Sequence, residues 1–140
     1  MGLKGSLEII LNEIERAQQK SSTNKEVILV AASKTRPFSL IKEVYSLGIR
    51  HIGENRIQEA VGKFESFEKM PDLTRRFIGH LQSNKINKFI ELFDTIDSID
   101  SFRLANKINT KIENKKKQVR GLIEINTSGD KNKKGFKPVL

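Results

Sequence analysis

The chain has 140 residues, of which 36% are hydrophobic and 31% are charged, and its formal net charge is +9. This length is enough for one domain with one core. No apolar run approaches the roughly 20 residues that a membrane-spanning helix needs, so we expect no membrane partner. The absence of cysteine excludes disulfides and thiolate metal sites and fits a cytoplasmic protein.

Much of the positive charge is concentrated in two segments. The first group consists of Lys111, Lys115, Lys116, Lys117 and Arg120, and the second consists of Lys131, Lys133, Lys134 and Lys137. Such groups are usually solvated loop and helix-end residues, but they also suit a phosphate-bearing ligand or a polyanion. A nucleic-acid-binding module would need aromatic side chains among the basic residues. The chain has one tyrosine, Tyr45 in a predicted helix, and no tryptophan, so we expect no nucleic-acid partner.

The first third of the chain predicts a helix, a strand and a second helix. Residues 6–20 place apolar side chains at helical spacing. Residues 27–33 form a short, nearly uninterrupted apolar run, which is typical of a parallel strand covered on both faces. A helix over residues 39–47 follows, which Ser39 can cap and Gly48 can end.

The same strand–helix unit then recurs along the rest of the chain. Strands are predicted at residues 50–53, 75–79, 94–97 and 120–126, and helices between them at residues 56–68, 84–93 and 101–113. Asp100 is a candidate cap for the last of these helices. Five strands that alternate with helices predict an α/β protein with a parallel sheet.

Two architectures are compatible with five parallel strands. At the observed spacing, eight such units and the leading helix would need about 200–230 residues, which is within the range of a (β/α)₈ barrel. A flavodoxin-like open sheet would instead need a final helix over the last strand, and residues 136–140 are too few to form one. We therefore expect a partial (β/α)₈ TIM barrel, with an N-terminal helix followed by about five parallel strands.

Polar or glycine-containing segments follow the predicted strands. They span residues 33–37, 53–56, 79–85 and 126–129, and Asp97 and Ser98 follow the remaining strand. Binding residues of parallel α/β proteins gather at the carboxyl ends of the strands. Each segment alone could be a cap or a turn, but four dense polar segments at one rim predict a site.

Lys34 is the unusual member of this group. It follows six apolar residues, so its side chain starts from the buried end of a predicted strand. A partly desolvated ammonium has a lowered pKa, and a neutral lysine amine is what Schiff-base formation with an aldehyde requires. The alternative is a rim lysine whose ammonium reaches solvent. These physical arguments leave both interpretations open.

Five segments of the chain resemble the pyridoxal-phosphate homeostasis proteins, a family related to the N-terminal barrel domain of alanine racemase. The segments read AASKTRP, HIGENRIQEA, FIGHLQSNK, TIDSID and INTSGDKNKKG, in the family's order and at its spacing. The resemblance implies a fold-type-III barrel that binds pyridoxal 5′-phosphate (PLP). Residues 1–140 would then form a single, incomplete PLP-binding domain, truncated to about the first five β/α units.

The resemblance also implies which residues bind the cofactor. Lys34 falls on the family's first-strand lysine, which holds PLP covalently as an internal aldimine. Asn55 falls near the cofactor ring, His80 and Ser83 fall in the third rim motif, and Lys133 falls in the loop after the fifth strand. The family's phosphate cradle comes from the loops after its last two strands, and this sequence contains no counterpart of those loops.

The implied function is intracellular PLP homeostasis, in which a reactive aldehyde is held and delivered. We expect a small-molecule partner, no metal, no residue in a catalytic role, and a monomer when the barrel is complete. The alternative is a PLP-dependent racemase-like enzyme, which shares the barrel but needs an acid–base group on each face of its substrate. Tyr45, on a predicted helix, should point away from the rim, so we expect no racemase activity.

Overall fold

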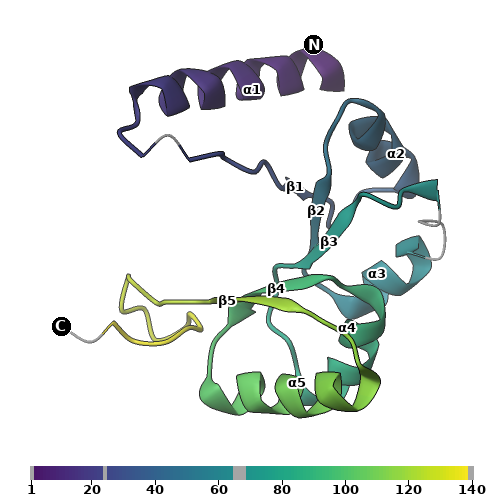
Figure 1. Cartoon of the computed structure of the whole chain (residues 1–140), viewed down its shortest axis with the longest axis vertical. Helices are drawn as coiled ribbons and strands as arrows, with labels where there is room; N and C mark the ends of the chain where they lie inside the picture. The colour runs from purple at the N-terminus through teal and green to yellow at the C-terminus, as the bar shows by residue number, and fades with distance from the viewer. Residues whose placement is uncertain (1, 24, 65–68, 139–140) are drawn as a thin grey trace.

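The computed structural model describes residues 2–23, 25–64 and 69–138, and helices and strands alternate along them (Figure 1). The helices are α1 (Leu3–Lys20), α2 (Phe38–Ser46), α3 (Ile57–Phe64), α4 (Ile86–Leu92) and α5 (Phe102–Lys115), with a 3-10 helix, η2, at Ser83–Lys85. The strands are β1 (Ala31–Ala32), β2 (His51–Glu54), β3 (Thr74–Phe77), β4 (Thr95–Ile99) and β5 (Arg120–Ile123). The predicted order of elements is confirmed, and the predicted end of the third helix, at residues 65–68, lies outside the described residues.

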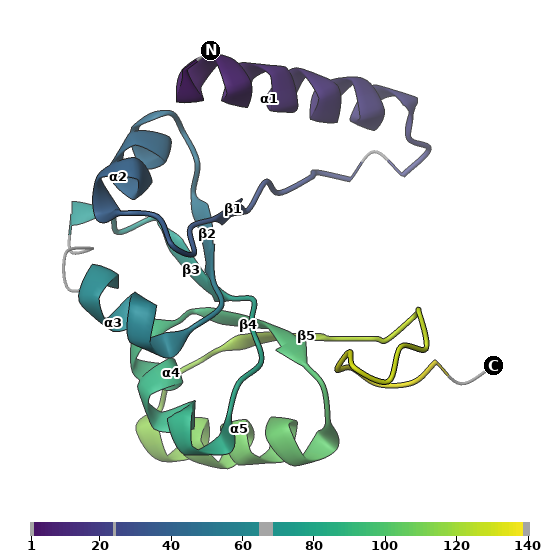
Figure 2. The same cartoon turned by 180° about the vertical axis from the view of Figure 1, so that it is seen from behind.

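The five strands form one parallel sheet in which each strand pairs with the next along the chain. Helices α2 to α5 lie on one side of this curved sheet, as Figure 1 and the view from behind in Figure 2 both show. A flavodoxin-like sheet would change strand order and carry helices on both faces. The observed order and layering are those of a (β/α)₈ barrel segment, so the prediction of a partial barrel is confirmed.

The hydrophobic core lies between the sheet and the helices α2 to α5. Ile52 of β2, Phe77 of β3 and Ile96 of β4 are at most 1% exposed. Phe93, which follows α4, packs edge-to-face on Phe77 with ring centroids 5.2 Å apart. Because successive strand residues point to opposite faces, the side chains next to these core residues lie on the concave face.

The first strand is shorter than predicted. Of residues 27–33, only Ala31 and Ala32 pair with β2, and Val27 and Ile28 are 51% and 54% exposed. Among the described strands, residues 27–33 pair only with β2, and β2 extends only along the last part of this segment. The expectation that this strand is covered on both faces is therefore wrong for the described structure.

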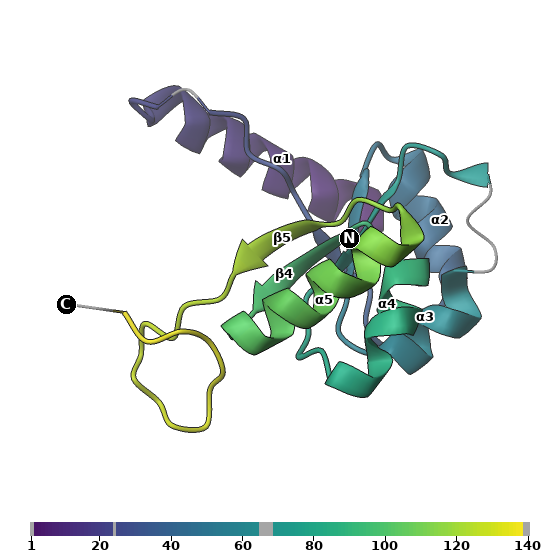
Figure 3. The same ribbon diagram turned by 60° about the horizontal axis from the view of Figure 1, so that its bottom comes forward.

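The last strand is also shorter than predicted and forms the other edge of the sheet. β5 ends at Ile123, and beyond it Ile125 makes an isolated parallel bridge with Phe136. Figure 3 shows β4 and β5 side by side near α5, with the loop after β5 extending past them. Among the described residues, the sheet therefore has two open edges, β1 and β5.

The helix ends confirm one sequence prediction and correct two. Gly48 has a φ of +98° and follows α2, as expected of a glycine that ends a helix. The same helix begins one residue before Ser39 and its cap position is Pro37. Helix α5 is capped by Ser101, whose side chain accepts a first-turn backbone N–H at 3.2 Å, and not by Asp100. Within the described residues, every helix is too short or too polar to cross a membrane.

Candidate ligand-binding rim

The segments that follow β1, β2 and β3 lie together at one rim because the strands are parallel and adjacent. The placement of one predicted pair is wrong. Asp97 and Ser98 lie inside β4, which continues to Ile99, so Asp100 and Ser101 are the residues that follow this strand. The shift arises because β4 is one residue longer than the predicted strand and starts one residue later.

Lys34 lies on a tight turn directly after β1. The Arg36 N–H donates to the Ser33 carbonyl at 3.0 Å, which closes the turn. Thr35 has a φ of +61°, a left-handed conformation that is uncommon for a β-branched residue. Lys34 is exposed, and within residues 2–23, 25–64 and 69–138 its ammonium makes no hydrogen bond or ion pair. Of the two interpretations that the sequence left open, this structure shows the exposed rim lysine.

A buried polar network supports this turn from below. Glu54 is 0% exposed, and its Oε1 accepts from the Ser33 hydroxyl and the Lys63 ammonium, both at 2.7 Å. Lys63 also donates to the Ser33 carbonyl at 2.9 Å. Glu59, 4.0 Å from the same ammonium, accepts the Thr35 N–H at 3.0 Å. Each residue that flanks Lys34 is thus bonded to this network.

This network was not predicted from the sequence, although the sequence contains two signals of it. Glu54 belongs to the Gly-Glu-Asn motif, which was assigned to the rim as a whole. Glu59 and Lys63 are four residues apart on α3 and therefore share a helix face. What the sequence could not show is that this face of α3 covers the end of β1, because that contact depends on tertiary packing.

Asn55 lies at the rim where the segment that follows β2 contacts the segment that follows β3. A Cβ added to Gly79 would lie 2.2 Å from the Asn55 carbonyl oxygen, so only glycine permits this approach. The side-chain Oδ1 of Asn55 is buried and has no partner among the described residues. Asn55 lines a hollow of about 580 Å³ together with Arg56, His80 and Lys85. An unpaired buried acceptor next to a hollow is a candidate ligand contact.

His80, Ser83 and Lys133 also meet at the rim. All three line a second hollow of about 450 Å³, and His80 and Lys133 line a third of about 350 Å³. The His80 Nδ1 lies 3.0 Å from Asp100 Oδ2, which fixes the orientation of the ring. The structure therefore brings four of the five predicted site residues together through the shared wall at His80. Lys34 is not a lining residue of these three hollows.

The loop that carries Lys133 is ordered by Asn126. Its side-chain Nδ2 donates to the carbonyls of Asp130 and Lys133 at 2.8 and 3.3 Å. Its Oδ1 accepts from the Ser128 hydroxyl and the Gly129 backbone N–H. The Phe136 ring packs edge-to-face on Phe102 at the start of α5, 5.3 Å between centroids. The loop is thus folded back toward the rim.

The first basic group is partly structural. The Lys117 ammonium donates to the carbonyls of Ile90 and Phe93 and so satisfies the carboxyl end of α4. Burial lowers its pKa. Lys115 lies 3.3 Å from Glu91. Because both side chains already have partners within the protein, this part of the chain is better explained by helix-end residues than by a polyanion site.

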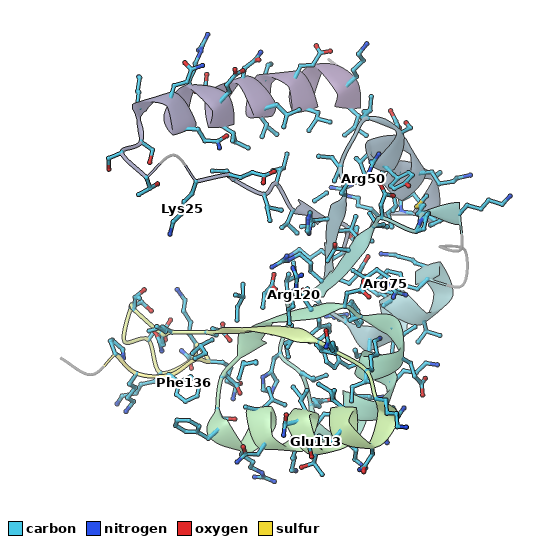
Figure 4. All side chains as sticks on the ribbon, viewed as in Figure 1. Lys25, Arg50, Arg75, Glu113, Arg120 and Phe136 are labelled. Carbon is cyan, nitrogen blue, oxygen red and sulfur yellow. The ribbon has the colours of Figure 1, made fainter. Side chains whose placement is uncertain are left out.

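Ionic side chains occupy the concave face of the sheet. Arg76 of β3 forms a bidentate pair with Asp97 of β4 at 2.7 and 2.9 Å, and its guanidinium lies 3.4 Å from His51 Nδ1. In Figure 4, Arg120 lies on this side, whereas Arg75 lies toward the helices. These residues lie toward the starts and middles of the strands, away from the rim that carries Lys34.

Sequential parallel strands, helices on one face and a polar rim at the strand ends define this chain as a segment of a (β/α)₈ barrel with a candidate ligand-binding rim. The chain is a relative of the pyridoxal phosphate homeostasis proteins, which confirms the resemblance carried by its motifs. It is 36% identical over 140 residues to the protein of that name from Haemophilus influenzae, covering 99% of this chain and 59% of that protein. The human protein is 30% identical over 148 residues, covering 99% of this chain and 54% of that protein.

Solved structures show the same relationship. PipY of Synechococcus elongatus, determined without PLP, aligns with a TM-score of 0.76 and 34% identity over 90% of this chain and 58% of PipY. The form of PipY with PLP bound aligns with a TM-score of 0.73. The chain spans little more than half the length of the curated relatives that it matches. No family model matches the chain.

Proposed function

We propose that residues 1–140 form a single domain that is part of a PLP-binding barrel, and that this barrel holds the cofactor through Lys34 for PLP homeostasis. The observation that carries the proposal is an exposed lysine amine with no ionic partner among the described residues, at the rim that also carries Asn55 and His80. The support from relatives is that one structural neighbour, PipY, binds PLP. A cytoplasmic location, expected from the cysteine-free composition, is part of the same proposal.

The residues present fit the aldehyde and ring end of PLP. When bound, PLP would supply an aldehyde, and Lys34 is the residue whose amine would hold it covalently. The buried, unpaired Oδ1 of Asn55 is placed to contact a ligand in the adjoining hollow. His80, Ser83 and Lys133 offer hydrogen-bond donors on its other side.

We propose further that the role is binding rather than catalysis. Racemisation needs a second acid–base group opposite the lysine. The Tyr45 hydroxyl donates to Asp72, which precedes β3 at the opposite end of the sheet from Lys34. That hydrogen bond raises the pKa of Tyr45, so less of the phenolate that could accept a proton is present near neutral pH. Alanine racemisation above the rate of free PLP, abolished by Lys34→Ala, would contradict this part of the proposal.

The test of the proposal is a trapped adduct. Incubation with PLP, reduction with borohydride and peptide mapping by mass spectrometry should show Lys34 labelled about tenfold more than other exposed lysines. Lys34→Ala should reduce total incorporation to the background. Lys111→Ala, which removes an exposed lysine from α5, serves as the matched control and should leave Lys34 labelling unchanged. Labelling spread evenly over the exposed lysines would refute the assignment.

A further inference from the structure

The backbone that carries Lys34 is strained. In the turn Ser33–Arg36, Thr35 occupies the third position with a φ of +61°. Turns with a positive φ at this position normally place glycine or asparagine there. A β-branched side chain pays a conformational cost in this region, so surrounding contacts must hold it. Here the side chains that hold the turn form hydrogen bonds with Ser33 and Thr35, the residues on either side of Lys34.

Glu59 is the direct contact with the strained residue. Its Oε2 accepts the Thr35 N–H at 3.0 Å, and its side chain is 27% exposed. Thr35 follows the end of β1, and its N–H is directed toward α3. The Glu59 carboxylate on α3 accepts this N–H. Glu59 therefore pairs with the backbone N–H of Thr35 in its left-handed conformation.

Lys63 connects this contact to the buried side of the turn. Its ammonium is 14% exposed and donates to the Ser33 carbonyl at 2.9 Å and to Glu54 at 2.7 Å. The same ammonium lies 4.0 Å from Glu59. Glu54 in turn accepts the Ser33 hydroxyl at 2.7 Å. The residue before Lys34 and the residue after it are thus held by one ionic network.

We propose that Glu59, Lys63 and Glu54 are positioning residues for Lys34, which hold the strained Ser33–Arg36 turn so that the lysine amine stands at the rim in a reactive orientation. This inference rests on the proposed function, because it assigns a purpose to the turn only if Lys34 reacts with an aldehyde. The network acts through Thr35 and Ser33 on the two sides of Lys34. Of its three members, Glu59 also lines the hollow beside Asn55. Misplacement of a reacting group by about 1 Å lowers rates by orders of magnitude, so a small relaxation of the turn is measurable.

The experiment measures the rate at which PLP labels Lys34, by borohydride trapping at timed intervals in the 140-residue chain. Glu59→Ala should slow labelling of Lys34 by about tenfold relative to the other lysines of the same molecule. Glu59→Gln, which keeps an acceptor for the Thr35 N–H, should retain most of the rate. Glu91→Ala is the matched control, since Glu91 is a helix-surface carboxylate paired with Lys88 and Lys115 on α4 and α5.

Relief of the strain provides a readout that a general loss of stability would not produce. Thr35→Gly removes the penalty for positive φ, so the double variant with Glu59→Ala should recover part of the rate lost in Glu59→Ala alone. Circular dichroism is used to check that each variant is folded. Lys63→Met tests the buried side, but it leaves Glu54 without its ion-pair partner and is interpreted only if that variant melts cooperatively.

The outcomes separate this inference from the proposed function. Wild-type protein that forms no adduct at Lys34 would overturn both. Wild-type protein that labels at Lys34, with Glu59→Ala labelling at the same relative rate, would leave PLP binding in place and overturn the positioning role. Loss of rate in Glu59→Ala that Thr35→Gly does not restore would overturn the assignment of the network to the strained turn.

Discussion

His51 faces an unusually basic environment on the concave side of β2. Burial lowers the pKa of His51 from its ordinary value of 6.5, and the Arg76 guanidinium lowers it further. Asp97 acts in the opposite direction, Arg120 adds to the lowering, and Glu26 opposes it. The folded protein therefore disfavours the charged imidazolium more than the unfolded chain does.

The first prediction follows from this pKa shift. Since the unfolded chain binds a proton at His51 at higher pH than the folded protein does, protonation costs folding stability as pH falls below about 6.5. The melting temperature of wild-type protein should therefore decrease between pH 7.5 and pH 5.5, and His51→Gln should show a smaller decrease. The measurement is thermal melting by circular dichroism across this range, and equal pH dependence in the two proteins would contradict the prediction.

At the scale of helices and strands, the sequence predicted the elements whose patterns are local. The helical spacing in residues 101–113 and the glycine at position 48 are properties of a few neighbouring residues, and both match the structure. The extent of the first strand was not predictable in this way, because pairing requires a neighbour that only the folded sheet supplies. The same holds for the site: the motif containing Lys34 was visible in the sequence, whereas the contact of Lys63 with Ser33 depends on how α3 packs.

The helix caps give the second prediction. Ser101 caps α5 through its side chain, with 3.2 Å between its hydroxyl oxygen and the Leu104 nitrogen. Ser101→Ala should therefore lower the free energy of unfolding by about 0.5–2 kcal/mol. Ser39 is the matched control, because α2 begins before it and its cap position shows no side-chain cap bond. Ser39→Ala should change stability by less than about 0.5 kcal/mol, as is usual for surface substitutions. Urea unfolding of both variants measures the difference, and equal losses would show that Ser101 does not act as a cap.

At the scale of the whole molecule, the two open edges of the sheet are the main feature of a polypeptide that consists of residues 1–140. β1 and β5 each have one pairing neighbour among the described strands. Leu122 and Ile123 on β5 are 53% and 67% exposed. Unpaired backbone groups beside apolar side chains promote edge-to-edge association. Figure 1 shows α1 and the loop after β5 standing apart across the open side of the sheet.

We therefore expect this polypeptide to self-associate, and the third prediction is that a charge on the β5 edge weakens the association. Ile123→Lys adds a positive charge to an exposed edge strand, and lysine on an edge discourages pairing with another strand. Thr110→Lys adds the same charge to an exposed position of α5 and controls for net charge. Light scattering should give a lower mean mass for Ile123→Lys than for wild-type protein, and no change for Thr110→Lys.

A second arm of the same experiment tests whether strands that pair with β1 and β5 prevent self-association and raise the melting temperature. Joining the chain to the remaining part of a relative supplies strands that can pair with β1 and β5, so the extended protein should be monomeric and melt at a higher temperature. If PLP binds as proposed, the extended protein should also retain it better on a desalting column, because each charge-assisted hydrogen bond to the phosphate is worth about 1.5–3 kcal/mol. Two or three such bonds correspond to roughly 10²–10⁶ in affinity. If residues 1–140 alone are monomeric, melt cooperatively and retain PLP to the same extent, the five-stranded sheet is self-sufficient and the open edges do not limit its stability.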